Sequence, residues 1–407
     1  MTVDASGRRP FFIEYTIRLM GGNVMKELAV SILGLGMMGR ARSVAYDNLT
    51  RLYPDCPIKP VLSQAFVLPN EVDAANSLGW RANTNMRSVL YADDTEYVDI
   101  CLPNAKHYAA TMMALDAGKH VFCEKPLAIS LNEAREMTEA AEARPDLLNS
   151  VHYTYRRVPA NVFARQLVQQ NRFGRLLEAR SYYNQHWGVG GNWGGWRFDS
   201  KAGGGTAGDL GSHAIDMLYF VTGKRPVRLC SMQFTHVNER VFTVDYTKED
   251  GTIEKKQELR KVEVDDATRV MYYLPDGAVG TLSCTRYAQG TENTQGYEFW
   301  FEHGAIRWCY DDLDYLEIYD SDDPQRGWKR VLCSKNGFAY QDTLDNPDVG
   351  YRDLLSAGCY ENMRAIAKID PVAPIASFRD AYDVDRTLEA IRLSAKNETW
   401  IRLDEVK

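Results

Sequence analysis

The chain has 407 residues, a length at which two hydrophobic cores are expected rather than one. Its formal net charge of -7 disfavours nucleic acids and anionic membranes as partners, because both reward clustered positive charge. No apolar stretch of the sequence approaches the roughly 18 residues needed to cross a bilayer. We therefore expect a small-molecule partner, with no nucleic acid and no membrane.

Eight cysteines are scattered along the chain without a C-x-x-C pair. This pattern predicts reduced, buried thiols in a cytoplasmic protein and no metal site. Residues 1–24 lack the long apolar core and the small-residue cleavage site of a secretion signal. Since Met25 opens a sequence whose first strand follows at once, we expect residues 1–24 to be a loosely ordered N-terminal extension.

A short apolar run at residues 28–33 predicts a buried parallel strand, followed by glycines at Gly34, Gly36 and Gly39 and a helix. The first glycine permits a tight turn, the second lets a pyrophosphate approach the backbone, and the third lets helix and strand pack closely. A phosphate there would meet free amides and the helix dipole. The pattern predicts a dinucleotide-binding Rossmann domain.

The second predicted strand, residues 61–67, bears on the choice of cofactor. It should end near an Asp or Glu that binds the adenosine ribose of NAD, or near an Arg that binds the extra phosphate of NADP. Neither occurs there, and the first acidic residues are Glu71 and Asp73. The residues leave the preference open. We favour NAD because no basic residue is available either, and NADP is not excluded.

Two further buried strands, residues 98–102 and 120–123, end on polar residues. The second strand closes on Glu124 and Lys125, at the carboxyl end of a parallel strand, which is where open α/β sheets bind their ligands. After residue 151 the predicted strands follow one another without intervening helices, which indicates antiparallel pairing. These strands are residues 177–185, 227–234, 268–274, 279–286 and 297–301. The charged stretch 245–256 is expected to be a solvated loop.

Asp209 and His213 lie four residues apart at the start of a predicted helix that Gly223 ends. That spacing places both side chains on one helix face. A histidine beside a carboxylate suits proton transfer near neutral pH. Taken alone, such a pair is more often a structural hydrogen bond.

The loop at residues 186–199 carries three tryptophans among several glycines. Flat indoles suit the C–H faces of a sugar ring, and the polar side chains of the loop suit its hydroxyls. The alternative is that the tryptophans fill the junction between two domains. The candidate substrate contacts in this loop are His186, Asn192, Trp193, Trp196 and Arg197.

Five short motifs follow one another along this sequence. They are Gly34-x-Gly36-x-x-Gly39, Pro103-Asn-x-x-His107, Glu124-Lys125-Pro126, Tyr155-Arg156-Arg157-x-Pro159 and Gly208-Asp209-x-Gly-x-His213-x-x-Asp216. Together they resemble the Gfo/Idh/MocA oxidoreductases, the family of glucose-fructose oxidoreductase, inositol dehydrogenase and rhizopine catabolism proteins. The resemblance runs from Met25 to the C-terminus. It implies an α/β Rossmann domain over residues 25–150 and an α+β domain over residues 151–407, with an open, mostly antiparallel sheet that binds substrate.

The resemblance also implies a catalytic set of Lys125, Asp209 and His213. In it, His213 takes the hydroxyl proton, Asp209 orients the imidazole, and Lys125 stabilises the developing alkoxide, its ammonium held by Glu124, Asp209 or both. The alternative for Lys125 is a purely structural ion pair with Glu124. The expected cofactor contacts are Gly34, Gly36, Met37, Met38, Gly39, Pro103, Asn104, His107, Glu124 and Lys125. The expected substrate contacts are Tyr155, Arg156, His186, Trp193, Trp196, Arg197, Asp209 and His213.

These residues favour an NAD(P)-dependent dehydrogenase acting on a secondary hydroxyl of a sugar, glycoside or cyclitol, with the sugar 3-position as one candidate. Hydride acceptance belongs to the cofactor, so no metal is required. One alternative is a glycoside-cleaving enzyme whose bound NAD is reduced and reoxidised in each turnover, and another is a non-catalytic sugar or nucleotide sensor. Because an exposed sheet face needs covering, we expect a homodimer or homotetramer.

Overall fold

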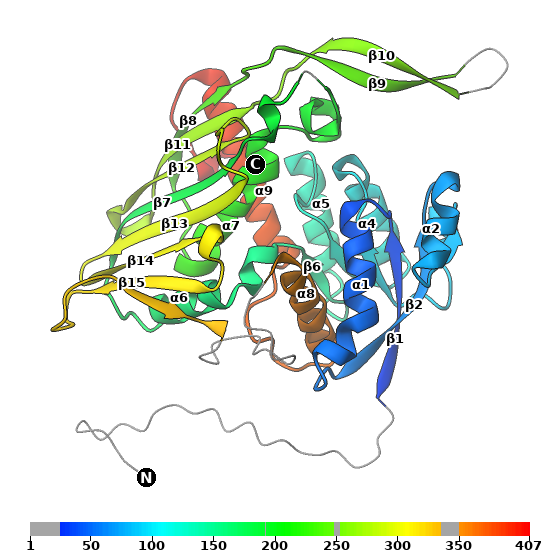
Figure 1. Ribbon diagram of the computed structural model, residues 1–407, viewed down its shortest axis with the longest axis horizontal. Helices are drawn as coiled ribbons and strands as arrows, with labels where there is room; N and C mark the ends of the chain where they lie inside the picture. Colours follow the sequence, from blue (N-terminus) through cyan, green and yellow to red (C-terminus); the bar gives the residue numbers. More distant parts are fainter. Residues whose placement is uncertain (1–24, 192, 248–252, 335–349) are drawn as a thin grey trace.

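A computed structural model describes residues 25–191, 193–247, 253–334 and 350–407 of the chain. The predicted extension at residues 1–24 and the candidate contact Asn192 lie outside the described residues. Figure 1 shows a helix-flanked sheet of parallel strands beside a larger, mostly antiparallel sheet, with helices α7 and α9 between them. The predicted fold class is confirmed.

The first sheet is parallel and has the strand order β3-β2-β1-β4-β5-β6. Its strands are buried on both faces, with Val30, Ile32 and Leu33 of β1 fully covered, because helices cross over between successive strands. This order reverses between β1 and β4, so their carboxyl ends frame a crevice where such sheets bind nucleotides. The elements are β1 Lys26–Leu33, α1 Met37–Leu52, β2 Ile58–Phe66, α2 Val72–Ser77, β3 Arg81–Asn83, α3 Met86–Leu90, β4 Tyr97–Ile100, α4 His107–Asp116, β5 His120–Cys123, α5 Leu131–Glu142 and β6 Asn149–Val151.

The second sheet has the order β16-β15-β14-β13-β7-β12-β11-β8-β17, and only β7 and β12 pair in parallel. One face packs on helices, while the other is open, so side chains alternate: Val270 and Tyr272 of β11 are buried, whereas Arg269 and Met271 are exposed. The strands are β7 Leu176–Gln185, β8 Arg228–Phe234, β11 Ala267–Tyr273, β12 Val279–Thr285, β13 Asn293–Phe301, β14 Gly304–Cys309, β15 Tyr315–Asp320, β16 Lys329–Leu332 and β17 Ile401–Arg402. The helices against this sheet are α6 Pro159–Gln169, α7 Ser212–Thr222 and α9 Phe378–Asn397.

The loop expected at residues 245–256 is wrong in the described part of that range. Strands β9 Glu239–Thr247 and β10 Ile253–Lys261 form an antiparallel hairpin that extends beyond the large sheet at the top of Figure 1. A two-stranded ribbon pairs through its backbone and leaves both faces near water, so charged side chains do not prevent it. Its base has an apolar contact, where Phe242 packs with Phe198, Val262 and Val264.

Helix α8, Tyr351–Ile366, returns from the second half of the chain to cover the first sheet. Its residues Leu355, Cys359 and Met363 are buried in the same apolar cluster as Val30 and Ile32 of β1. Tyr360 stacks on Tyr53 at the end of α1, with ring centroids 4.2 Å apart. In the part of the chain described, no helix is long and apolar enough to span a membrane.

Candidate active site

The glycine turn between β1 and α1 has the shape that a dinucleotide requires. Gly34 has φ +93°, and a Cβ added there would lie 2.9 Å from the carbonyl oxygen of Cys101. A Cβ on Gly39 would lie 2.0 Å from the carbonyl oxygen of Gly34, whereas one on Gly36 would meet only open space. Since no side chain caps α1 at Gly36, the first amides of the helix are available to a phosphate. These residues fit the pyrophosphate of a dinucleotide.

The structure corrects one predicted cofactor contact next to this turn. His107 is fully buried, and its two ring nitrogens lie 2.9 Å from the carbonyl oxygens of Leu102 and Pro126. The imidazole therefore fixes the two strand ends to each other and has no nitrogen left for a ligand. Asn104, in the turn after Pro103, donates to the carbonyl oxygen of Gly203 and so reaches the second half of the chain.

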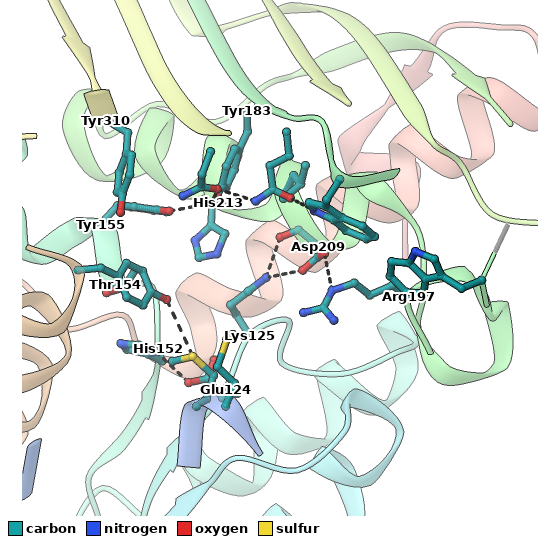
Figure 2. Close-up of a pocket in the computed structure, with 18 residues that line it drawn as sticks. Glu124, Lys125, His152, Thr154, Tyr155, Tyr183, Arg197, Asp209, His213 and Tyr310 are labelled. Carbon is teal, nitrogen blue, oxygen red and sulfur yellow. Dashed lines mark hydrogen bonds and ion pairs between the residues drawn. The ribbon is translucent and has the colours of Figure 1, made fainter. Parts of the chain in front are cut away.

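A cavity of about 560 Å³ lies between the end of β5 and the start of α7. It brings together Lys125 and His213, which come from the two halves of the chain (Figure 2). The predicted site residues that line it are Met37, Met38, Glu124, Lys125, Tyr155, Trp193, Arg197, Asp209 and His213. The lining residues that the sequence did not indicate include His152, Thr154, Tyr183, Gln185, Leu210, Asn293, Tyr310 and Tyr351.

Asp209 sits among three cations. Lys125 Nζ donates to its carbonyl oxygen at 2.7 Å and to its Oδ1 at 3.1 Å. Its Oδ2 accepts from Arg197 Nε at 3.2 Å and from Arg286 Nη2 at 3.1 Å. Burial opposes ionisation, but Lys125, Arg286 and Arg197 outweigh it and hold the pKa of Asp209 well below its usual range. The carboxylate is therefore a fixed negative charge that positions Lys125 (Figure 2).

His213 is a buried, neutral imidazole at the wall of the cavity. Only 8% of the residue is exposed, and the rings of Tyr153, Tyr155 and Tyr183 surround it. Burial, and then the ammonium of Lys125, lower its pKa well below the ordinary value, while Asp209 acts in the opposite sense. A neutral imidazole can accept a proton, so the site holds this side chain in the state that a base requires.

The expected contact between Asp209 and His213 does not form. Among the described residues no hydrogen bond joins them, and His213 Nδ1 is buried without a partner. A π turn over Ala207–Gly211 precedes α7, so the backbone spacing at Asp209 differs from the α-helical one that the prediction assumed. The carboxylate faces the three cations instead of the imidazole.

Glu124 does not hold Lys125 either. Its Oε1 accepts from Arg42 Nη2 at 2.8 Å and lies 2.9 Å from His152 Nδ1, and no hydrogen bond to Lys125 occurs within the described ranges. Burial opposes ionisation of Glu124, but His152 and Arg42 hold its pKa far below the usual range. The alternative of a structural Lys125–Glu124 ion pair is wrong, since Lys125 bonds Asp209.

Three predicted substrate contacts lie outside the cavity. Arg156 is buried, and its Nε lies 3.0 Å from both carboxylate oxygens of Asp216, because the residue after the cavity-lining Tyr155 faces the helices. His186 Nδ1 lies 2.9 Å from the carbonyl oxygen of Thr291. The exposed ring of Trp196 lies against the guanidinium of Arg197, with Cζ 4.3 Å from the ring centroid.

Arg286 is the main site residue that sequence reasoning missed. It follows β12, is fully buried, and donates to the carbonyl oxygens of Arg197 and Gly205 as well as to Asp209. An arginine at the end of a predicted core strand was the available signal. Tyr310 and Tyr351 lie more than a hundred residues beyond the tryptophan-containing loop at residues 186–199. No local sequence pattern indicates that they belong to the site.

Comparisons with known proteins identify the family of this chain. Residues 28–152 match the family model described as the oxidoreductase family, NAD-binding Rossmann fold, and residues 162–307 match the GFO/IDH/MocA C-terminal domain. Levoglucosan dehydrogenase of Pseudarthrobacter phenanthrenivorans is 31% identical over 394 residues, which cover 94% of this chain and 100% of that protein. D-Glucoside 3-dehydrogenase of Escherichia coli is 31% identical over 199 residues, covering 48% of this chain and 54% of that protein.

Solved structures give the same answer. Levoglucosan dehydrogenase in complex with NADH and levoglucosan has a TM-score of 0.83 and 29% identity, with 93% of this chain and 100% of that chain covered. An oxidoreductase domain protein from Kribbella flavida has a TM-score of 0.84 and 32% identity, with the same coverage. The chain therefore belongs to the Gfo/Idh/MocA family of NAD-dependent oxidoreductases.

Proposed function

We propose that this chain oxidises a secondary hydroxyl of a sugar, glycoside or cyclitol, with NAD as the acceptor and Lys125, Asp209 and His213 as the catalytic set. The observation that carries the proposal is one cavity that holds the Lys125 ammonium, anchored by Asp209, and the neutral His213 imidazole. Levoglucosan dehydrogenase, similar over nearly the whole chain, has been solved with NADH and levoglucosan. The name of the relative D-glucoside 3-dehydrogenase further favours the sugar 3-position.

The residues that would hold the cofactor are those of the glycine turn, with Met37 and Met38 bordering the cavity. When bound, NAD supplies a hydride acceptor for the carbinol hydrogen. Met37 is largely exposed at the start of α1, so it offers an apolar surface where turn and cavity meet. This part of the chain orients the cofactor and leaves proton transfer to the opposite wall.

His213 accepts the hydroxyl proton in this proposal. Since its Nδ1 is buried, Nε2 is the ring nitrogen left for the cavity. Lys125 has three N–H donors, of which two bond Asp209, so one is left for the substrate oxygen. As the hydroxyl loses its proton, that N–H and the ammonium charge stabilise negative charge developing on the oxygen. Asp209 acts by keeping the ammonium in place.

The remaining walls suit a polyol. Tyr155 and Tyr183 are joined through their hydroxyls at 2.9 Å, and Tyr183 donates to Asn293 Oδ1 at 2.9 Å, which forms a fixed row of polar groups. The indole of Trp187 also lines the cavity and adds an apolar surface. Several convergent polar groups beside an aromatic ring are the usual means of holding a sugar.

The test is a panel of monosaccharides, glycosides and inositols with NAD and with NADP, followed by absorbance of the reduced nicotinamide. We expect Lys125→Met and His213→Gln each to lower kcat by about 100-fold or more while NADH still binds. The control is His303→Gln, an exposed histidine at the turn between β13 and β14, which should keep wild-type activity. Near wild-type turnover in either site variant would refute the catalytic set. Aglycone release without accumulation of NADH would favour the glycoside-cleaving alternative.

We also propose that the open face of the large sheet is covered by another copy of the chain, as a homodimer or homotetramer. Met232 and Met271 on this face are 61% and 54% exposed, a pattern common at protein interfaces. Light scattering coupled to size exclusion measures the mass directly. A monomer at micromolar concentration would refute this proposal, and Met271→Glu should shift an oligomer towards monomer.

We further propose a cytoplasmic location. All eight cysteines carry free thiols, and burial raises the pKa of those in the core, such as Cys123 and Cys284, so they stay protonated. Free thiols are the rule in reducing compartments. Fractionation of cells that produce the chain would test the location, and recovery in an exported fraction would contradict it.

A further inference from the structure

The indole of Trp193 is exposed at the cavity, while its backbone is held by contacts with β9. Its side chain lines the cavity, and the residue is 47% exposed. Its backbone forms a β-bridge with Val241 of β9, and Gly194 N donates to the Val241 carbonyl oxygen at 2.6 Å. Arg240, fully buried, donates to the Trp193 carbonyl oxygen at 3.2 Å. The base of the β9–β10 hairpin thus fixes an aromatic ring that faces solvent.

The ring of Trp187 separates Trp193 from the cations around Asp209. Trp187 comes first, with the guanidinium Cζ atoms of Arg286 and Arg197 5.1 and 5.9 Å from its ring centroid. Trp193 then stacks on Trp187, with centroids 5.6 Å apart and planes 24° apart. We call these two indoles the aromatic shelf. Phe198 packs edge-on against both rings, so the shelf is supported from below.

The cavity is larger than one sugar ring and a nicotinamide require. A pyranose has six carbon–oxygen units, which occupy about 180 Å³ in all if each takes roughly the 30 Å³ share of a water molecule. A nicotinamide of no greater size leaves about 200 Å³ of the 560 Å³ cavity for a further ring. Trp193 is among the residues that line this cavity.

We propose that the aromatic shelf is a second binding subsite, which takes a ring attached to the sugar being oxidised. The preferred substrates are therefore glycosides or disaccharides with a ring-shaped substituent. The inference rests on the proposed function, because Lys125 and His213 locate the reacting ring. An indole fixed by a hairpin and a buried arginine loses little entropy on binding, which favours a stacking role.

The experiment compares methyl and phenyl glycosides of D-glucose, D-galactose and D-mannose, which differ only in the substituent. Both kcat/KM and, independently of turnover, Kd from tryptophan-fluorescence quenching in the presence of NADH are measured. We expect the phenyl glycoside to be favoured by about tenfold in at least one series. Trp193→Ala should remove this preference by weakening the phenyl glycoside more than the methyl glycoside, and Trp193→Phe should keep part of it.

The control is Trp400→Ala, a tryptophan of similar exposure, 43%, that does not line the cavity. It should leave the phenyl preference unchanged. Equal binding of methyl and phenyl glycosides by the wild type in every series would overturn the subsite, as would a Trp193→Ala variant that loses both substrates in proportion. If phenyl glycosides bind more tightly through Trp193 but no compound of the monosaccharide, glycoside and inositol panel is oxidised, the proposed function fails and the subsite stands.

Discussion

Lys125 donates to both the backbone carbonyl oxygen and the carboxylate of Asp209, at 2.7 and 3.1 Å. Lys125 follows strand β5 of the parallel sheet, which ends at Cys123, and Asp209 lies in the π turn before α7. One ammonium therefore joins the two halves of the cavity and has a third N–H beyond the two that bond Asp209. Because Lys125 also bonds the backbone carbonyl oxygen of Asp209, neutralising the Asp209 carboxylate removes only part of this contact.

Asp209→Asn should lower kcat by about 100-fold or more, because Lys125 loses the charge that positions it. It should also cost about 2 kcal/mol or more of unfolding free energy, since Arg286 is left buried beside a neutral amide. Kinetics with saturating NAD and urea unfolding measure the two effects. Asp93→Asn, at an exposed position after α3, is the control and should change neither. An Asp209→Asn enzyme with wild-type kcat would exclude the positioning role.

The pH dependence of kcat/KM should follow His213. Burial and Lys125 lower the imidazole pKa well below 6.5, so the neutral base persists as the pH falls to 6.5 and is lost only when protonation begins below that value. The profile should be flat from pH 8 to 6.5 and decline at lower pH. Asp209→Asn should move the decline to still lower pH, because the Asp209 carboxylate raises the pKa of His213 and its loss lowers that pKa further. An acid limb centred at 6.5 or above would contradict this assignment.

Two glycines of the nucleotide turn should behave differently when each is changed to alanine. A Cβ at Gly36 meets open space, so Gly36→Ala should fold with a nearly unchanged Tm but bind NADH at least tenfold more weakly. A Cβ at Gly39 would lie 2.0 Å from the Gly34 carbonyl oxygen, so Gly39→Ala should lower Tm markedly. Thermal unfolding and NADH fluorescence separate the two outcomes. Equal effects of the two variants on stability would refute this division.

Arg156 should matter for stability rather than for substrate. Its guanidinium is buried against Asp216, and loss of one partner leaves an uncompensated charge, which typically costs 3–5 kcal/mol. Arg156→Met should therefore lower the urea midpoint strongly, while the KM of the folded enzyme stays within about twofold. The corresponding change at the partner, Asp216→Asn, should match it in stability. A large rise in KM at unchanged stability would restore the predicted substrate role.

Asp385 should make the fold less stable as the pH rises. Burial raises its pKa to about 8, and its Oδ2 accepts from Ala128 N. An unfolded aspartate titrates near 3.9, so between pH 4 and 8 only the unfolded chain releases this proton, and stability falls. Asp385→Asn removes that penalty and should stabilise the fold by at least about 1 kcal/mol at pH 8 and by little near pH 4. Asp370→Asn, which is exposed, is the control for urea unfolding at both pH values.

The sequence predicts the parts of this protein that depend on local pattern. The turn at Gly34, Gly36 and Gly39 was readable because three backbone constraints fall within six residues. The pairing of Asp209 with His213 was wrong, since a π turn is not visible in residue spacing. Arg286 reaches Asp209 through the strand order of a nine-stranded sheet, and Tyr351 reaches the cavity through the return of α8. These are long-range contacts that no window of sequence contains.

The return of α8 has a consequence for how this protein can be divided. Leu355, Cys359 and Met363 complete an apolar cluster whose buried members outside α8 lie between Leu28 and Phe122. A fragment that ends after β6 would expose this apolar surface to water. The complementary fragment would contain α8 without the residues it packs against. The apolar core of the nucleotide-binding half is therefore complete only when the last sixty residues of the chain are present, and a cut after β6 would not separate two independently folding domains.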